Sequence, residues 1–278
     1  MTLLLIHADD FGLTEGVTKG ILRAMQEGIV TATSAMVCDP LHFERVKQHC
    51  SGLEGRIGLH LQLTDGRPIL TRREIPSLVD ENGSFTRHRD LIGDTRPGEL
   101  LMEWRAQLAR FRTLGFEPSH LDTHHSVHVL PAVLEVYRQL ARETGLPLRG
   151  GENGLNSELR RCGFIAATRY AFLTESLYRS PGALRRALAA YRRLGLGDGD
   201  SLEIGCHPGF VDAELAAQSR YVEPRAVELQ LLCSAELRGY VNELGYELAE
   251  PAMLRRACLS TEGSYSGRSQ ETSPEENR

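Results

Sequence analysis

Short stretches of strand length, most of them rich in apolar residues, recur along the chain at residues 3–6, 31–37, 57–63, 119–123 and 201–206. The first is continuously apolar and stops at polar residues, which is typical of a strand buried on both faces of a parallel sheet. The third alternates strictly, so its leucines share one face with Ile57 while His60 shares the other face with Gly58 and Gln62. We predict a strand at each of these five places.

Helical spacing fills the intervals between these strands. Thr14 is a suitable N-cap for a helix with apolar residues every three or four positions, and Gly28 stands where a glycine commonly ends a helix. Pro131 suits the first turn of another helix, which Gly145 ends. Further helices are predicted over 99–114, 180–195 and 225–244. Strands that alternate with helices predict an α/β fold with a mainly parallel sheet, either open or closed into a barrel.

Two segments lack this periodicity. Residues 64–97 carry Gly, Pro and scattered charge, so we predict a long surface loop of the kind that is usually functional or mobile. Residues 260–278 are rich in Ser, Gly and Glu without an apolar period, which predicts a disordered tail. The remainder, 1–259, is expected to form a single domain.

The composition excludes several classes of protein. Lys and Arg number 32 against 37 Asp and Glu, so the chain lacks the basic excess expected of a nucleic-acid or membrane-surface protein. No apolar stretch is long enough to cross a bilayer, and the first residues do not resemble a secretory signal. The six cysteines are spread singly, which argues against a disulfide scaffold. We therefore expect a cytoplasmic protein with reduced thiols.

Polar side chains follow the predicted strands at their carboxyl ends. They are Asp9 and Asp10, His60, Asp122 with His124, and His207. Such strand ends meet at one edge of a parallel sheet, and one carboxylate with two imidazoles can hold a divalent metal while leaving a position open for water. The alternative is that the two acids are loop residues, that His60 faces solvent and that His207 is a turn histidine.

The densest cluster of candidate functional residues is a set of four histidines among nine residues, from His120 to His128. If this segment is helical, His124 and His128 lie on one face, because they are four residues apart. Asp122 could accept a hydrogen bond from a metal-ligating imidazole and fix its orientation. His207 precedes a Pro-Gly turn, from which a general acid could reach a bound substrate.

These residues, in this order, resemble the YdjC-like carbohydrate deacetylases. The matching segments are Ala-Asp-Asp-Phe-Gly at 8–12, Gly-Ile-Val-Thr at 28–31, Ile-Gly-Leu-His at 57–60, His-Leu-Asp-Thr-His-His at 120–125 with Val-His at 127–128, Cys-His-Pro-Gly-Phe at 206–210, and a stretch at 221–229 that contains Arg225. The resemblance covers about residues 3–250. It departs at Ser126, where some relatives have a third consecutive histidine.

The resemblance implies a distorted (β/α) barrel with mainly parallel strands and surrounding helices, and a metal-dependent hydrolase that removes the acetyl group from an N-acetylated amino sugar. Asp10, His60 and His124 match the metal ligands. Asp9 matches the proposed base and His207 a proposed acid. Arg225, like Asp122 and His128, is a candidate for a supporting or substrate-binding role.

The expected mechanism uses a metal-activated water, with Asp9 as base and either His207 or His128 as acid. One divalent ion is expected, Mg²⁺ or Zn²⁺, with Mn²⁺ and Co²⁺ also compatible with the ligands. The expected partner is a small N-acetylated sugar, with no nucleic acid and no membrane, and a homodimer is left open. Two alternatives remain: a phosphoesterase or other metallohydrolase, and a barrel that binds sugar without turnover.

Overall fold

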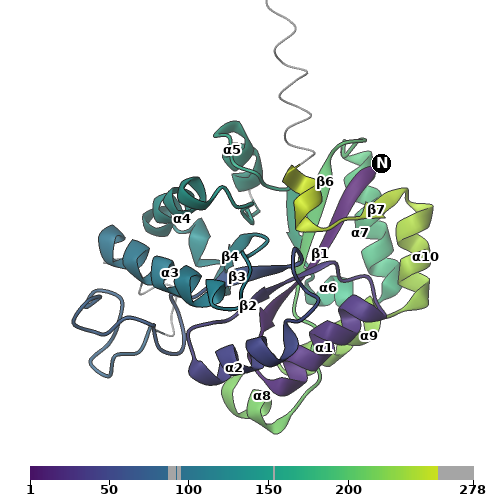
Figure 1. The fold of residues 1–278 in the computed structure, drawn as a ribbon. Coiled ribbons are helices and arrows are strands. Elements are labelled where there is room, and N and C mark those ends of the chain that lie inside the picture. Colours follow the sequence, from purple (N-terminus) through teal and green to yellow (C-terminus); the bar gives the residue numbers. More distant parts are fainter. Residues whose placement is uncertain (87–91, 93–94, 153, 256–278) are drawn as a thin grey trace, which may run out of the picture.

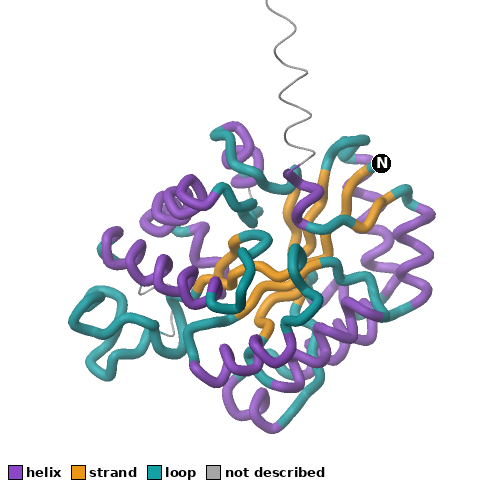
Figure 2. The backbone as a smooth tube through the Cα atoms, viewed as in Figure 1, coloured by secondary structure: helices purple, strands orange, loops and turns teal. Residues whose placement is uncertain are grey.

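The computed structural model describes residues 1–86, 92, 95–152 and 154–255. Within them, seven parallel strands form one curled sheet that helices surround (Figures 1 and 2). The strands are β1 (Thr2–Phe11), β2 (Ala32–Ala35), β3 (Ile57–Leu61), β4 (Leu121–Thr123), β5 (Arg169–Phe172), β6 (Ser201–Cys206) and β7 (Tyr246–Leu248). The predicted fold class, a distorted barrel of parallel strands, is confirmed.

The strand order places β1 at the centre of the sheet. The order is β4-β3-β2-β1-β6-β5, and β7 pairs with the first residues of β1. Each residue of β1 is buried, because the sheet is covered on both faces, and this accounts for its continuous apolar run. The carboxyl ends of β1, β3, β4 and β6 consequently meet at one edge.

An extended segment, residues 147–149, connects β4 to the chain that precedes β5. The Leu121 amide donates to the Pro147 carbonyl, the Arg149 amide donates to the Leu121 carbonyl, and the Leu148 amide donates to the Ile165 carbonyl. The segment lies along the β4 edge of the curled sheet and holds the side chain of Arg149 in the interior, where it is 2% exposed.

The helices pack around the outside of the sheet (Figure 1). They are α1 (Glu15–Gln26), α2 (Pro40–His49), α3 (Pro97–Arg112), α4 (Pro131–Thr144), α5 (Leu155–Arg161), α6 (Glu175–Tyr178), α7 (Pro181–Arg193), α8 (Ala213–Gln218), α9 (Glu223–Leu232) and α10 (Ala235–Glu243). None of the described helices is long and apolar enough to cross a bilayer. The predicted N-cap is confirmed, since the Thr14 hydroxyl accepts from the Val17 amide.

The predicted single helix over 225–244 is wrong, because the chain breaks at Cys233 and Ser234. Ser234 has extended backbone angles and its hydroxyl accepts from the Leu237 amide, so it caps a new helix, α10. Gly28 also differs from its predicted role: it has no positive φ, and a Cβ there would lie 2.5 Å from the Leu232 carbonyl oxygen. Close packing of α1 against α9, rather than a left-handed turn, accounts for this glycine.

Other elements were missed because their sequences carry little periodicity. Helix α2 buries only Val46, and β5 and β7 are short and partly exposed. The predicted tail, 260–278, lies outside the described residues.

Candidate active site

Three side chains from three strand ends converge at the carboxyl edge of the sheet. Asp10 belongs to β1, His60 to β3, and His124 directly follows β4. Oδ1 of Asp10 lies 3.0 Å from Nδ1 of His124 and 3.3 Å from Nε2 of His60, and these two nitrogens are 3.3 Å apart. The three atoms are close enough to share one metal ion, and all three side chains are buried.

A tight turn at the end of β1 directs Asp10 into this site. Its φ is 70°, a left-handed value that aspartate tolerates better than most residues. The described non-glycine residues with positive φ are Asp10, Asp65, His125 and Ser126, and all four line one cavity. Unfavourable backbone angles of this kind concentrate at functional sites.

Opposite charges keep Asp10 ionised. Burial would raise its pKa, but the charges of Arg225 and His124 outweigh burial and hold the pKa well below its usual range. Nη2 of Arg225 donates to Oδ2 of Asp10 over 2.6 Å. The structure therefore places Arg225, which the resemblance had suggested, against the candidate ligand.

His60 is oriented from behind by Asp122. Nδ1 of His60 lies 2.9 Å from Oδ1 of Asp122 and 3.0 Å from the Ser34 hydroxyl, which leaves Nε2 facing Asp10 and His124. Burial disfavours a charged imidazole, yet the charge of Asp122 and hydrogen bonds to Asp10 and Asp122 raise the pKa of His60 to about 10. The surroundings of His60 thus strongly favour positive charge.

Asp9 points to a different partner, a buried arginine that the sequence pattern did not reveal. Arg149 binds both carboxylate oxygens of Asp9 over 2.7 Å each, and also reaches Asp122 and Glu203 over 3.0 and 2.9 Å. Burial would raise the pKa of Asp9, but Arg149 lowers it below its usual value. The candidate base is therefore ionised, and Arg149 connects it to the residue that orients His60.

His207 stands across from the two aspartates. Its Nε2 is 3.8 Å from Oδ2 of Asp9 and 3.8 Å from Oδ2 of Asp10. The ring packs between Phe172 and Tyr221, and burial lowers its pKa to about 4. Behind it, the Glu228 carboxylate accepts from the His207 backbone amide and from the Tyr221 hydroxyl, so this turn is anchored.

A cavity of 1140 Å³ opens over these residues. Its wall includes Asp9, Asp10, His124 and His207, and also part of the predicted long surface loop, 64–97. The aromatic residues on the wall are Phe85 from that loop, Phe172 and Tyr221. Phe172 and Tyr221 lie far from that loop in the sequence, so no local pattern associates them with it.

Comparison with known proteins agrees with this geometry. Residues 3–243 match the family model described as YdjC-like protein. The chain belongs to the YdjC-like family. It is 34% identical to a carbohydrate deacetylase of Geobacillus stearothermophilus, with 88% of this chain and 94% of the relative aligned. It is 35% identical to a chitooligosaccharide deacetylase of Serratia marcescens, over 88% and 96% of the two chains.

A solved structure shares the YdjC-like fold seen here. It comes from Enterococcus faecalis V583 and is named as a candidate cellobiose-phosphate cleavage protein. The TM-score is 0.81 at 34% identity, over 91% of this chain and 98% of that one.

The histidine-rich segment of this YdjC-like chain does not form a regular α-helix. His124–Val129 is a 3₁₀ segment kinked where His125 and Ser126 adopt left-handed angles, so His124 and His128 do not share a helix face. His128 lies buried with Nδ1 2.6 Å from the Thr123 hydroxyl and Nε2 donating to the Gly150 carbonyl over 2.6 Å. With both ring nitrogens bonded, it supports the segment instead of facing the cavity.

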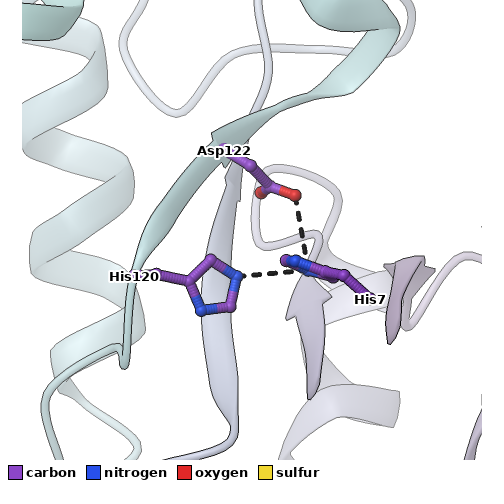
Figure 3. A group of neighbouring side chains, drawn as sticks. All are labelled: His7, His120 and Asp122. Carbon is purple, nitrogen blue, oxygen red and sulfur yellow. Dashed lines mark hydrogen bonds and ion pairs between the residues drawn. The ribbon is translucent and has the colours of Figure 1, made fainter. Parts of the chain in front are cut away.

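A second group of metal-binding side chains, His7, His120 and Asp122, lies deeper in the barrel (Figure 3). The two rings face one another through their Nε2 atoms, 3.1 Å apart, and Nε2 of His7 lies 3.5 Å from Oδ2 of Asp122. Glu203 and the Ser119 hydroxyl bond the two Nδ1 atoms. These residues do not line the cavity, and the ring of His120 fills the space that Gly58 leaves. We interpret them as a hydrogen-bonded core network of the YdjC-like barrel.

The charges around Asp10, His60 and His124 fit a divalent cation. Asp9, Asp10, Asp122 and Glu203 all have lowered pKa values, so four carboxylates face the two guanidiniums of Arg149 and Arg225. Two negative charges are left over, and the pKa of His60 is raised accordingly. A donor set of one carboxylate and two imidazoles is typical of a catalytic metal site with open positions.

Proposed function

We propose that this chain is a metal-dependent carbohydrate deacetylase, which hydrolyses the acetamide of an N-acetylated amino sugar. The observation that carries the proposal is the convergence of Asp10, His60 and His124 beside Asp9 and His207 at one cavity. The relatives named carbohydrate deacetylase and chitooligosaccharide deacetylase support it. A volume of 1140 Å³ exceeds the range of about 300–1000 Å³ for sites of drug-sized ligands, so the cavity has room for a short oligosaccharide.

Asp10, His60 and His124 would hold the ion. A bound divalent cation would supply Lewis acidity, which polarises the acetamide carbonyl and lowers the pKa of a water molecule. Two imidazole donors favour Zn²⁺ or a similar transition metal over Mg²⁺. Asp122 and Ser34 keep Nε2 of His60 directed at the site.

Asp9 and His207 would move the proton. Asp9 is ionised beside Arg149, so a carboxylate oxygen can accept the proton of the attacking water. Nε2 of His207 lies 3.8 Å from Oδ2 of Asp9, beyond direct hydrogen-bond distance, so transfer of this proton to His207, and from it to the leaving nitrogen, requires the two groups to approach or one water molecule between them. An amine leaves poorly unless it is protonated, which makes an acid at this position necessary.

We also assign the chain to the cytoplasm. The described cysteines, Cys38, Cys50, Cys162, Cys206 and Cys233, are free thiols, as expected in a reducing compartment.

The decisive experiment is an acetate-release assay on N-acetylglucosamine and N,N′-diacetylchitobiose, with Zn²⁺, Mg²⁺, Mn²⁺ or Co²⁺ added to metal-stripped protein. We expect metal-dependent release that Asp10→Asn and His124→Ala abolish. His49→Ala is the control, because His49 at the end of α2 pairs with Glu15 of α1 and neither residue lines the cavity. Phosphate release from sugar phosphates without acetate release would favour a phosphoesterase, and sugar binding without turnover would favour a binding protein.

A further inference from the structure

Gln62 is a buried amide on the cavity wall with no hydrogen bond to its side-chain oxygen. The residue is 2% exposed and borders the cavity, yet Oε1 has no partner among the described residues. Buried polar groups in folded proteins are nearly always paired, so each unpaired one calls for a physical reason. No role in the reaction described above uses Gln62.

The backbone of Gln62 is held firmly by two side chains of α3. Oε1 of Gln107 accepts from the Gln62 amide over 2.9 Å, and Nε2 of Gln107 donates to the Gln62 carbonyl over 2.9 Å. Nε1 of Trp104 donates to the same carbonyl over 3.1 Å. Just beyond the end of β3, the Gln107 side chain thus makes the two backbone hydrogen bonds that a neighbouring strand would make. The backbone of Gln62 is fixed while Oε1 of its side chain is left unpaired.

The strand geometry directs Gln62 toward the reacting group. Side chains two residues apart on an extended chain point to the same side, about 6.6 Å apart. Gln62 therefore follows His60 by one step toward the cavity, whose wall also includes His124 and Asp10. A sugar with its acetamide at the candidate metal ligands would present its neighbouring atoms to Gln62.

We propose that Gln62 is a substrate-binding residue whose Oε1 accepts a hydrogen bond from the amino sugar, either from the acetamide N–H or from the adjacent 3-hydroxyl. This inference rests on the proposed function and adds a specificity determinant to the same site. The unpaired amide is unfavourable in the free protein and becomes paired only when the sugar is bound, so the binding energy favours sugars with a donor at this place.

The test replaces Gln62 with methionine, which keeps the volume and removes the amide. We expect Gln62→Met to lower kcat/KM for N-acetylglucosamine about 10- to 100-fold, while Tm stays unchanged or rises because an unpaired buried group is removed. Gln139→Met is the matched control, since Gln139 is exposed on α4. An unchanged kcat/KM, or a fall in Tm that shows a structural role, would overturn the proposal.

The 3-deoxy analogue of N-acetylglucosamine identifies the donor. If the 3-hydroxyl is the donor, the analogue reacts as slowly with the wild type as with Gln62→Met. If the N–H is the donor, Gln62→Met lowers kcat/KM by the same factor for N-acetylglucosamine and for its 3-deoxy analogue. Sugar-induced rises in Tm give a readout that needs no turnover. If no acetate is released but the sugar raises Tm of the wild type more than that of Gln62→Met, the role of Gln62 in sugar binding is supported and the deacetylase proposal fails. If the sugar does not raise Tm of the wild type either, both proposals are overturned.

Discussion

Arg149 neutralises several buried carboxylates at once. It contacts Asp9, Asp122 and Glu203 and is itself buried, so its removal would leave three carboxylates facing one another in a medium of low polarity. Asp122 in turn orients His60. The geometry of the candidate base and that of a candidate metal ligand are therefore fixed by one guanidinium.

We predict that Arg149→Met lowers the free energy of unfolding by about 3–5 kcal/mol, because it removes one partner of a buried ionic cluster. Urea unfolding measures this directly. The control is Arg105→Met, whose ion pair with Glu143 lies at the surface with Arg105 half exposed, and which should cost at most about 1 kcal/mol. Equal losses in the two variants would show that burial of the cluster has no energetic consequence.

Glu228 predicts a pH dependence of stability. Burial raises its pKa from 4.5 to about 7, despite the hydrogen bonds from Tyr221 and His207 and the charge of Arg225 that oppose the rise. Since the folded pKa lies above the unfolded one, the contribution of Glu228 to stability is full below about pH 4.5 and is lost as the pH rises through 7. Comparing Tm of the wild type and Glu228→Gln from pH 5 to 8 measures it. Tm of Glu228→Gln should rise relative to Tm of the wild type as the pH increases. A Tm difference that stays constant from pH 5 to 8 would refute the raised pKa of Glu228.

At the scale of elements, local patterns predicted the buried strands better than the ends of those strands. The apolar run of β1 and the alternation of β3 mark buried strands, but β1 continues past the predicted run to Phe11, so Asp10 lies within the last residues of β1, as His60 lies within β3. Arg149 could not be found in this way. It lies outside the named strands, on a segment placed by long-range hydrogen bonds to Leu121 and Ile165, and no local period encodes those contacts.

Gly28 and Gly145, both predicted to end helices, require glycine for two different physical reasons. Gly145 adopts a left-handed angle, φ 64°, with open space around it, so Gly145→Ala should cost about 1–2 kcal/mol of backbone strain. At Gly28 an added Cβ would lie 2.5 Å from the Leu232 carbonyl oxygen and 2.6 Å from that of Ala24, both backbone atoms. Gly28→Ala must therefore push α1 from α9, at a cost of about 3 kcal/mol. Urea unfolding of the two variants should rank them in this order, and the reverse order would contradict the packing explanation.

For the whole molecule, the ionised groups of the barrel interior account for both its fold and its chemistry. The carboxylates near the sheet edge outnumber the guanidiniums that neutralise them, and they lie buried within the curled sheet of apolar strands. Such an arrangement is costly for the protein alone and favourable once a cation is bound. Metal binding is thus expected to contribute to global stability as well as to catalysis.

This coupling gives a prediction that does not depend on the substrate. Removing divalent ions with a chelator should lower Tm, and adding Zn²⁺ at about 100 times its dissociation constant should restore about 2.7 kcal/mol of stability. The protein should bind one ion per chain, because His7 and His120 are bonded to each other and to core oxygens. Asp10→Asn should lose the Zn²⁺-dependent rise in Tm, whereas His49→Ala should keep it. An equal rise in Asp10→Asn, or two ions per chain by elemental analysis, would place the metal elsewhere in the barrel.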